Sequence, residues 1–343
     1  MQESIKKAIT TCLEHGISFY AFREPGGTTF SFGAQVDSDF QANEGFRIVP
    51  FVENNDYKKS TIYKQFDATN LPDNMPILPK RTNTNAEFTK EEYLDAATEC
   101  INRIRNNETL KKVVLSRTIN IDATGIDRVQ FLELLERTYP NAFVFIYQTP
   151  TTGSWIGATP ETLGKYDGTI FRTVALAGTR KVCNEKWDEK DIEEQEFVVK
   201  YISNLADRLH LQYKISPKYT KNAGHIEHLC NDFYITERDY NKITDFVNLL
   251  HPTPALAGLP KDEAINSILD IEKHDRKYYG GYIGPFNGNC FYYSVNLRSL
   301  SFDDKTATLY IGGGITDKSN PEKEYSETIA KSQTLLSILS KIR

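Results

Sequence analysis

Two short turn signals constrain the fold of this chain more than any other feature. The segments Tyr166-Asp-Gly-Thr169 and Phe286-Asn-Gly-Asn-Cys290 each place a dipeptide typical of tight turns, Asp-Gly or Asn-Gly, between two apolar runs. This pattern predicts β-hairpins. Hairpins join antiparallel neighbours, and the strand–helix alternation of a doubly wound fold is absent. The sequence therefore predicts an α+β fold, a large antiparallel two-sheet sandwich with helices packed outside.

Local patterns predict where the helices and strands lie. Thr89-Lys-Glu-Glu92 is a capping box that opens a helix, and Asn320 and Pro321 suit the N-cap and first position of the final helix. Further helices are expected at 4–15, 128–137 and 188–209. Strands are expected at 18–22, 28–32, 112–119, 142–148, 155–158, 290–300 and 306–311.

The length of 343 residues suits one large domain. We expect a single domain over 1–343, with a divergent N-terminal part at 1–90 and a catalytic core at 91–343. The segment 78–89 is polar and irregular, and it is either a linker or a long surface loop.

Composition limits the partners and the compartment. The net charge of −5 argues against a broad nucleic-acid or anionic-membrane surface. The five cysteines are odd in number and scattered, which favours reduced thiols in a cytoplasm. The first residues do not resemble a signal peptide, and no apolar run is long enough to span a membrane. We therefore expect a cytoplasmic protein. We also expect a monomer, because no amphipathic segment is left over for a partner.

The final helix is expected to carry charges on its docking face. Glu324, Glu327, Lys331, Leu335 and Ile338 follow the i, i+3, i+4 spacing of one stripe. Charges on a docking face are costly unless they are paired or bind an ion. The glycines at 312–314 come just before this helix, so the pattern indicates a polar site beside backbone that a ligand can touch.

A second helix repeats this arrangement. Glu194 shares a stripe with Val198, Ile202 and Leu205, so it is expected to face inward. Glu194 and Glu327 could together hold Mg²⁺, which favours one or two carboxylates, waters and an anionic substrate. The alternative is a carboxylate bonded to a backbone amide or an arginine.

Three more charged residues have both an ordinary and a functional interpretation. Lys112 begins a strand, and it is either solvated or a base of lowered pKa in a pocket. Glu161 is either a surface turn acid or a rigidly held general acid. Arg298 is expected to share a strand face with Tyr292, Ser294 and Asn296, where it forms a surface ion pair or recognises a carboxylate.

Together these segments resemble the chorismate-utilising enzymes, which include anthranilate synthase component I, and most closely the isochorismate synthases. The resemblance runs from about Lys112 to Lys331 through eight blocks in the same order. The blocks are Lys112-Val-Val-Leu-Ser-Arg117, Gly157-Ala-Thr-Pro-Glu161, Leu176-Ala-Gly-Thr179, Glu189-Lys-Asp-Ile-Glu-Glu194, Leu250-His-Pro-Thr-Pro-Ala-Leu256, Asp275-Arg-Lys-Tyr-Tyr-Gly-Gly281, Gly312-Gly-Gly314 and Glu324-Tyr-Ser-Glu327.

The resemblance implies a Mg²⁺-dependent chorismate site and a role for each matching residue. It implies that Lys112 activates the water that attacks C2 and that Glu161 protonates the departing C4 hydroxyl. It makes Glu194 and Glu327 the Mg²⁺ ligands, with Glu324 nearby. The implied substrate contacts are Gly178, Thr179, His228, Ala255, Arg298, Gly313, Gly314 and Lys331.

The resemblance leaves alternatives for the product and the pathway. Lysine at position 112 indicates a water-using member of the family, and Ala255 stands where salicylate-forming relatives tend to carry threonine. We therefore expect isochorismate as the product, with salicylate synthase as the alternative. A catalytically silent relative is a third hypothesis, although it has no reason to keep Lys112, Glu161, Glu194 and Glu327. Menaquinone biosynthesis is the expected pathway, and a catechol siderophore is the alternative.

Overall fold

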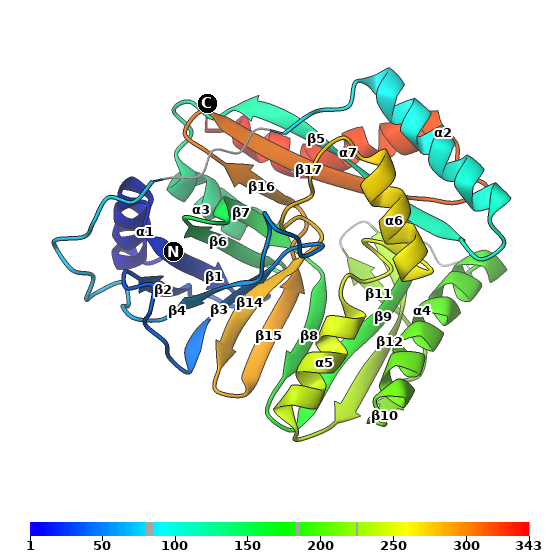
Figure 1. The fold of residues 1–343 in the computed structure, drawn as a ribbon, viewed down its shortest axis with the longest axis horizontal. Helices are drawn as coiled ribbons and strands as arrows, with labels where there is room; N and C mark the ends of the chain where they lie inside the picture. The colour runs from blue at the N-terminus through cyan, green and yellow to red at the C-terminus, as the bar shows by residue number, and fades with distance from the viewer. Residues whose placement is uncertain (80–84, 183–185, 224–225, 343) are drawn as a thin grey trace.

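The computed structural model describes residues 1–79, 85–182, 186–223 and 226–342, which form two antiparallel sheets and seven helices (Figure 1). The first sheet has the order β13 (Gly258–Leu259), β5 (Lys112–Asp122), β17 (Thr306–Ile315), β16 (Ser299–Phe302), β7 (Gly153–Thr159), β6 (Phe143–Thr149), β1 (Ser18–Arg23) and β2 (Ser31–Gln35). The second has the order β10 (Gln212–Ile215), β12 (Ile226–Thr236), β9 (Ile170–Lys181), β8 (Thr162–Tyr166), β15 (Cys290–Val295), β14 (Tyr282–Asn287), β3 (Glu44–Val49) and β4 (Ser60–Tyr63), and β11 (Tyr219–Ala223) also pairs with β12. The predicted α+β two-sheet fold is confirmed.

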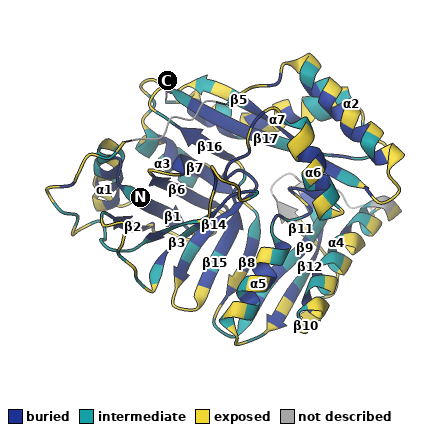
Figure 2. Ribbon diagram, in the orientation of Figure 1, coloured by how far each residue is buried: buried dark blue, intermediate teal, exposed yellow. Residues whose placement is uncertain are grey.

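The helices lie outside the sheets. The helices α1 (Glu3–His15), α3 (Arg128–Thr138) and α7 (Pro321–Leu339) pack on the first sheet, and α4 (Glu189–Arg208) and α5 (Tyr240–Leu250) lie beside the second (Figure 1). The helices α2 (Lys90–Asn106) and α6 (Lys261–Ile271) pack against β5. Buried and exposed residues alternate along α4 and α5, while most strands are buried (Figure 2).

Aromatic rings fill the space between the sheets. Tyr20 of the first sheet stacks on Phe46 of the second with ring centroids 5.1 Å apart, and Phe143 stacks on Tyr292 at 5.6 Å. Trp155 is fully buried. Such rings contribute both apolar area and preferred stacking geometry, so they hold the two sheets face to face.

The chain crosses directly from one sheet to the other at two neighbouring points. Pro160 and Glu161 link β7 to β8, and residues 296–298 link β15 to β16. The Ala158 N–H donates to the Arg298 carbonyl at 3.1 Å, and the Val295 N–H donates to the Glu161 carbonyl at 2.9 Å. These bonds hold the two crossings side by side, as in sandwiches whose strands switch sheets.

Both predicted hairpins form. The first turn joins β8 to β9, and the second joins β14 to β15. The expected strand at 290–300 is instead two strands, because the chain leaves the second sheet after Val295 and enters the first at Ser299. The strand expected at 28–32 lies at Ser31–Gln35, where it pairs with β1.

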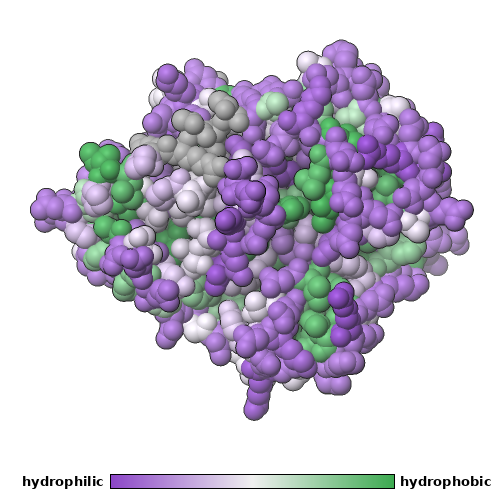
Figure 3. Space-filling model, viewed as in Figure 1, coloured by the Kyte–Doolittle hydropathy of each residue, from purple (hydrophilic) through white to green (hydrophobic). Residues whose placement is uncertain are grey.

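The surface is polar. On the face viewed in Figure 3, hydrophilic side chains cover most of the molecule and hydrophobic ones show in separate patches. Among the described residues, no helix combines the length and apolar character needed to cross a lipid bilayer.

The predicted capping box at the start of α2 is confirmed, and it generates a stability prediction. The Glu92 N–H donates to Thr89 Oγ1 at 3.2 Å, and the Thr89 N–H donates to Glu92 Oε2 at 2.9 Å. We expect Thr89→Ala to lower the free energy of unfolding by about 1 kcal/mol, because the Glu92 N–H loses its acceptor. Urea unfolding measures the change. Thr98→Ala on the exposed surface of the same helix is the control, and an equal effect of the two changes would contradict the capping role.

Candidate functional site

Lys112 lies at the start of β5, beside the glycines of β17. Its side chain is partly buried, and β17 pairs with β5 so that Gly314 lies opposite Val114. A Cβ atom built on Gly314 would be only 2.6 Å from Lys112 Cε and 3.3 Å from Nζ. The missing side chain at position 314 therefore leaves the space that the lysine occupies across the neighbouring strand.

Glu161 lies at the first crossing between the sheets and has a perturbed carboxyl group. Its side chain is partly buried, and desolvation raises its pKa to about 7, while the positive charges of Arg298 and Lys112 act in the opposite direction. A carboxyl group that is substantially protonated near neutral pH can act as a general acid. The structure thus brings Lys112, Glu161 and Arg298 into one electrostatic neighbourhood.

The predicted strand position of Arg298 is wrong. Arg298 follows β15, has a φ of 50° and is exposed to solvent. Its main chain turns out of the second sheet because the Asn296 N–H donates to the Gly281 carbonyl at 2.8 Å and the Asn296 side chain donates to the Tyr278 carbonyl at 2.9 Å. The guanidinium therefore lies at the second crossing, next to Glu161, rather than on a sheet face.

The predicted docking face of α7 is right for Leu335 and Ile338, which are buried, and wrong for its charged members. Glu327 and Lys331 are exposed and pair with each other at 2.6 Å, and Glu324 is partly buried. The buried positions are Thr328, Ser332, Leu335, Ile338 and Leu339. Thr328 and Ser332 can be buried because their hydroxyls donate to carbonyls of the preceding turn, so the charged residues lie on the flank.

The flank of α7 nevertheless faces the glycines of β17. Lys331 Nζ donates to the Gly312 carbonyl at 3.1 Å. A Cβ atom on Gly313 would be 3.7 Å from Glu324 Oε2, and Glu324 Oε1 accepts from the Ser319 hydroxyl at 2.7 Å. The structure therefore brings Glu324, Lys331 and the glycine backbone together, as the sequence pattern predicted.

The Glu194 carboxylate, which was predicted to face inward, is not at a fully buried position of α4. Glu194 is partly buried, whereas its neighbour Gln195 is fully buried on the same inner face as Ile202 and Ala206. Gln195 donates to Asn231 on β12, and a neutral amide with a partner is far less costly to bury than a carboxylate. The apolar members of the predicted stripe, Val198, Ile202 and Leu205, do pack on the core, but Gln195 rather than Glu194 takes the buried polar position.

The residues present suit a Mg²⁺ ion in their chemistry, although the structure does not bring them together as ligands. Among the described residues, no group of three His, Cys, Asp or Glu side chains is arranged to hold a metal. Glu324 and Glu327 lie one turn apart on α7, and Glu194 lies on α4. Carboxylate oxygens are the donors that Mg²⁺ prefers.

Gly178 and His228 meet across β9 and β12. The pairing register shifts between Glu227 and Leu229, and Gly178 there has a φ of 68°, as expected for a glycine in a β-bulge. His228 Nδ1 lies 2.9 Å from the Gly178 carbonyl. The side chain of Thr179 lies outside the described part of the structure.

Ala255 and Tyr279 complete the description of the site. Ala255 is exposed in a turn that the Leu256 N–H closes by donating to the Thr253 carbonyl at 2.9 Å. Sequence reasoning missed Tyr279, which is buried with its hydroxyl 3.1 Å from a Cβ built on Gly312 and which interacts electrostatically with Glu161. Its signal was the block Asp275–Gly281, which carried no assigned role.

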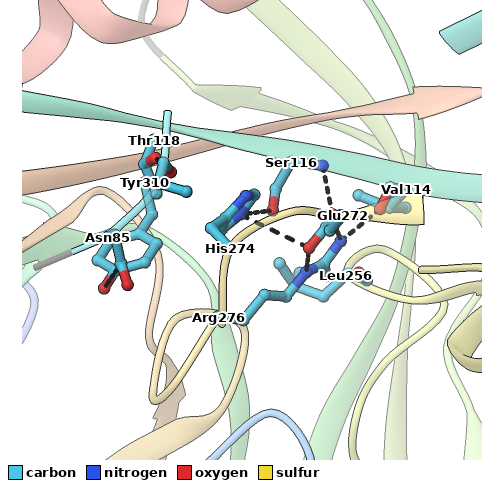
Figure 4. A network of polar contacts seen from close by, with 10 residues as sticks. Asn85, Val114, Ser116, Thr118, Leu256, Glu272, His274, Arg276 and Tyr310 are labelled. Carbon is cyan, nitrogen blue, oxygen red and sulfur yellow. Dashed lines mark hydrogen bonds and ion pairs between the residues drawn. The ribbon is translucent and has the colours of Figure 1, made fainter. Parts of the chain in front are cut away.

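A buried polar network below β5 is not a nucleophile site. Ser116 Oγ lies 3.0 Å from His274 Nε2, and Glu272 Oε2 lies 3.6 Å from the same nitrogen (Figure 4). A serine nucleophile needs its acid partner on the other ring nitrogen, and Ser116 is fully buried. The network therefore has a different role.

The raised pKa of Glu161 predicts a specific pH dependence of stability. The folded pKa is about 7 against an ordinary value of 4.5, so the native state holds a proton that the unfolded chain releases, and stability falls as pH rises between these values. Glu161→Gln should lack this fall. The free energy of unfolding of the variant minus that of the parent should therefore be roughly 1–3 kcal/mol larger at about pH 8 than at about pH 4.

Urea unfolding across this pH range measures the difference. Glu237→Gln is the control, because hydrogen bonds from the Asp239 and Arg238 N–H groups lower the pKa of Glu237, so its removal should change the pH dependence with the opposite sign. If the parent and Glu161→Gln follow parallel pH profiles, the assignment of a neutral Glu161 is wrong.

Comparisons with known proteins identify the family of this chain. Residues 52–340 match the family model described as chorismate binding enzyme. The isochorismate synthase MenF of Haemophilus influenzae is 25% identical over 313 residues, 88% of this chain and 73% of that protein. The isochorismate synthase EntC of Escherichia coli is 31% identical over 244 residues, 66% of this chain and 62% of that protein. The relatives also include anthranilate synthase component 1 of Methanothermobacter marburgensis.

The fold agrees with the family match. The structure of MenF, the menaquinone-specific isochorismate synthase from Escherichia coli, superposes with a TM-score of 0.80 at 19% identity, covering 94% of this chain and 88% of that one. The likeness in fold and the family match over most of the chain lead to one conclusion: the chain belongs to the family of chorismate binding enzymes.

Proposed function

We propose that this protein is an isochorismate synthase that converts chorismate to isochorismate in a Mg²⁺-dependent reaction. The observation that carries the proposal is the meeting of three groups. Glu161 at the first crossing has a raised pKa, and the positive charges of Lys112 at the start of β5 and of Arg298 at the second crossing act on it. The names of the MenF and EntC relatives support the same activity.

Each step of the reaction has a suitable group in this chain. Lys112 takes a proton from the water that attacks C2, and both ring double bonds shift, from C1=C2 to C1=C6 and from C5=C6 to C4=C5, as the C4–O bond breaks. Glu161 gives the C4 hydroxyl its proton, so one water enters and one leaves. A group of pKa near the working pH is the most effective acid for such a transfer.

The remaining residues bind and orient the substrate. Arg298 and Lys331 supply positive charge for the two carboxylates of chorismate, and the β17 glycines allow the substrate to approach the backbone. Glu194, Glu324 and Glu327 would hold Mg²⁺, which, when bound, offsets the repulsion between these glutamates and a dianionic substrate.

We propose menaquinone biosynthesis as the pathway that this enzyme supplies. The relatives in Haemophilus influenzae and Bacillus subtilis are named MenF, the name of the menaquinone-specific isochorismate synthase of Escherichia coli, and this supports the choice. Supply of a catechol siderophore is the alternative.

Product analysis with a lysine variant tests the activity. We expect purified protein incubated with chorismate and Mg²⁺ to form isochorismate and to release no pyruvate. Chromatography identifies the product, and a parallel assay measures pyruvate.

Lys112→Ala should lower kcat by about 10²–10⁴-fold, because it removes the general base. Lys111→Ala, which removes the exposed neighbouring lysine, is the matched control and should keep activity. Salicylate with equal pyruvate would move the function to salicylate synthase, and unchanged chorismate would indicate a silent relative.

A metal titration tests the proposed ligands. Glu327→Gln should raise the Mg²⁺ concentration needed for half-maximal activity by about tenfold or more, because it removes a charged oxygen ligand. Glu322→Gln is the control on the same helix, since Glu322 is exposed and pairs with Lys90 at 3.0 Å. An unchanged Mg²⁺ requirement in Glu327→Gln would show that Glu327 is not a ligand.

A further inference from the structure

Two buried charges lie under the strand that carries Lys112. Glu272 and Arg276 are each 3% exposed in their side chains, and they form two contacts, Nη2 to Oε1 at 2.5 Å and Nε to Oε2 at 2.8 Å. We call them the edge pair. Replacing a buried ion pair with apolar residues is often neutral or stabilising, so stability alone does not account for this pair.

The edge pair lies where β5 has no neighbouring strand. Among the described strands, β13 is the one on this side of β5, and its pairing ends at Val113. The Val114 N–H still donates to the Ala257 carbonyl at 2.9 Å. From the Val114 carbonyl onward, the strand edge would present bare C=O and N–H groups. Val114 and Ser116 point their backbone groups toward this open side, because alternate residues of a strand do so.

The edge pair fills the place of the missing strand. Arg276 Nη2 donates to the Val114 carbonyl at 2.5 Å, and Glu272 Oε1 accepts from the Ser116 N–H at 2.6 Å (Figure 4). The pair thus supplies one hydrogen-bond donor and one acceptor to β5, as the backbone of a neighbouring strand would. The ion pair and these backbone bonds satisfy one another, which is the condition for burying charge.

Arg276 also connects this strand to a second segment of the site. Its Nη1 donates to the Leu256 carbonyl at 2.7 Å, and Leu256 follows Ala255. Val114 is two residues from Lys112 on the same strand. The Arg276 guanidinium therefore links β5, the strand that carries Lys112, to the turn that contains Ala255.

We propose that Glu272 and Arg276 are positioning residues that hold Lys112 and the Ala255 turn in register for the reaction. The inference rests on the proposed function for its kinetic consequence, and its structural consequence is independent of it. Glu272 and Arg276 do not touch the substrate and act through the backbone of β5.

Arg276→Lys tests the proposal. Lysine keeps the charge for Glu272 but lacks the planar fork that reaches two carbonyls. We expect kcat to fall by about 10–100-fold, because small displacements of a reacting group have effects of this size. We expect KM for chorismate to change by less than about threefold, since Arg298 and Lys331 lie on other segments. Amide exchange at Ser116 should accelerate by about tenfold or more as its acceptor loosens.

Arg128→Lys is the matched control. Arg128 donates to the Asp303 carbonyl and lies over the Phe302 ring at 5.2 Å, away from the site. It should lower stability without changing kcat or the exchange of Ser116. If Arg276→Lys does not fold, Glu272→Gln is used, and kcat is the readout. Its amide oxygen still accepts from Ser116, but the charge that holds Arg276 is lost, so a smaller fall in kcat of about threefold to tenfold is expected.

The outcomes separate the two proposals. Ser116 exchange that stays at the parental rate in Arg276→Lys overturns the positioning role, whatever the activity. A kcat equal to that of Arg128→Lys, or an equal loss in kcat and rise in KM, overturns it as well. Failure of the parent protein to convert chorismate, with fast Ser116 exchange in the variant, overturns the proposed function and supports the positioning role.

Discussion

The structure depends on a chain that must pass between two packed sheets. Where β7 leads into β8 and β15 leads into β16, the backbone leaves one hydrogen-bonded ladder before it joins the next. The two crossings satisfy each other, through the bonds from Ala158 to Arg298 and from Val295 to Glu161. Because the backbone is fixed there without regular pairing, the side chains at the crossings can lie close to each other. They are the Glu161 carboxyl, whose pKa is raised, and the Arg298 guanidinium.

The other side of the site is shaped by what the strands lack. Without a side chain at Gly314, β17 leaves room for Lys112, and β13 is too short to cover the edge of β5. A glycine run and an open edge would each weaken a sheet in isolation. The edge pair and the pairing of β5 with β17 compensate for both, so the lysine stands on a strand that is held from two sides.

Sequence reasoning succeeded where the signal is local. The hairpin turns, the capping box at Thr89 and the Asn320 N-cap are each decided within about four residues, and all three form. It failed where distant segments decide. Gln195 rather than Glu194 is buried because Asn231 on another strand offers a partner. Arg298 lies outside the predicted strand because Asn296 donates hydrogen bonds to the carbonyls of Gly281 and Tyr278. The edge pair could not be foreseen, since its partners on β5 come from more than a hundred residues earlier.

The position of the acidic residues of α7 follows from the same balance of burial and charge. Glu327 and Lys331 pair on the exposed flank of the helix, while Thr328 and Ser332 are buried because their hydroxyls find carbonyls within the helix. A carboxylate on the inner face would be desolvated and locked to a protein partner. On the flank, Glu327 stays exposed to solvent and pairs with Lys331, whereas Glu324 is held by Ser319 near Gly313. The helix thus separates the residues that dock it from the charged residues on its flank.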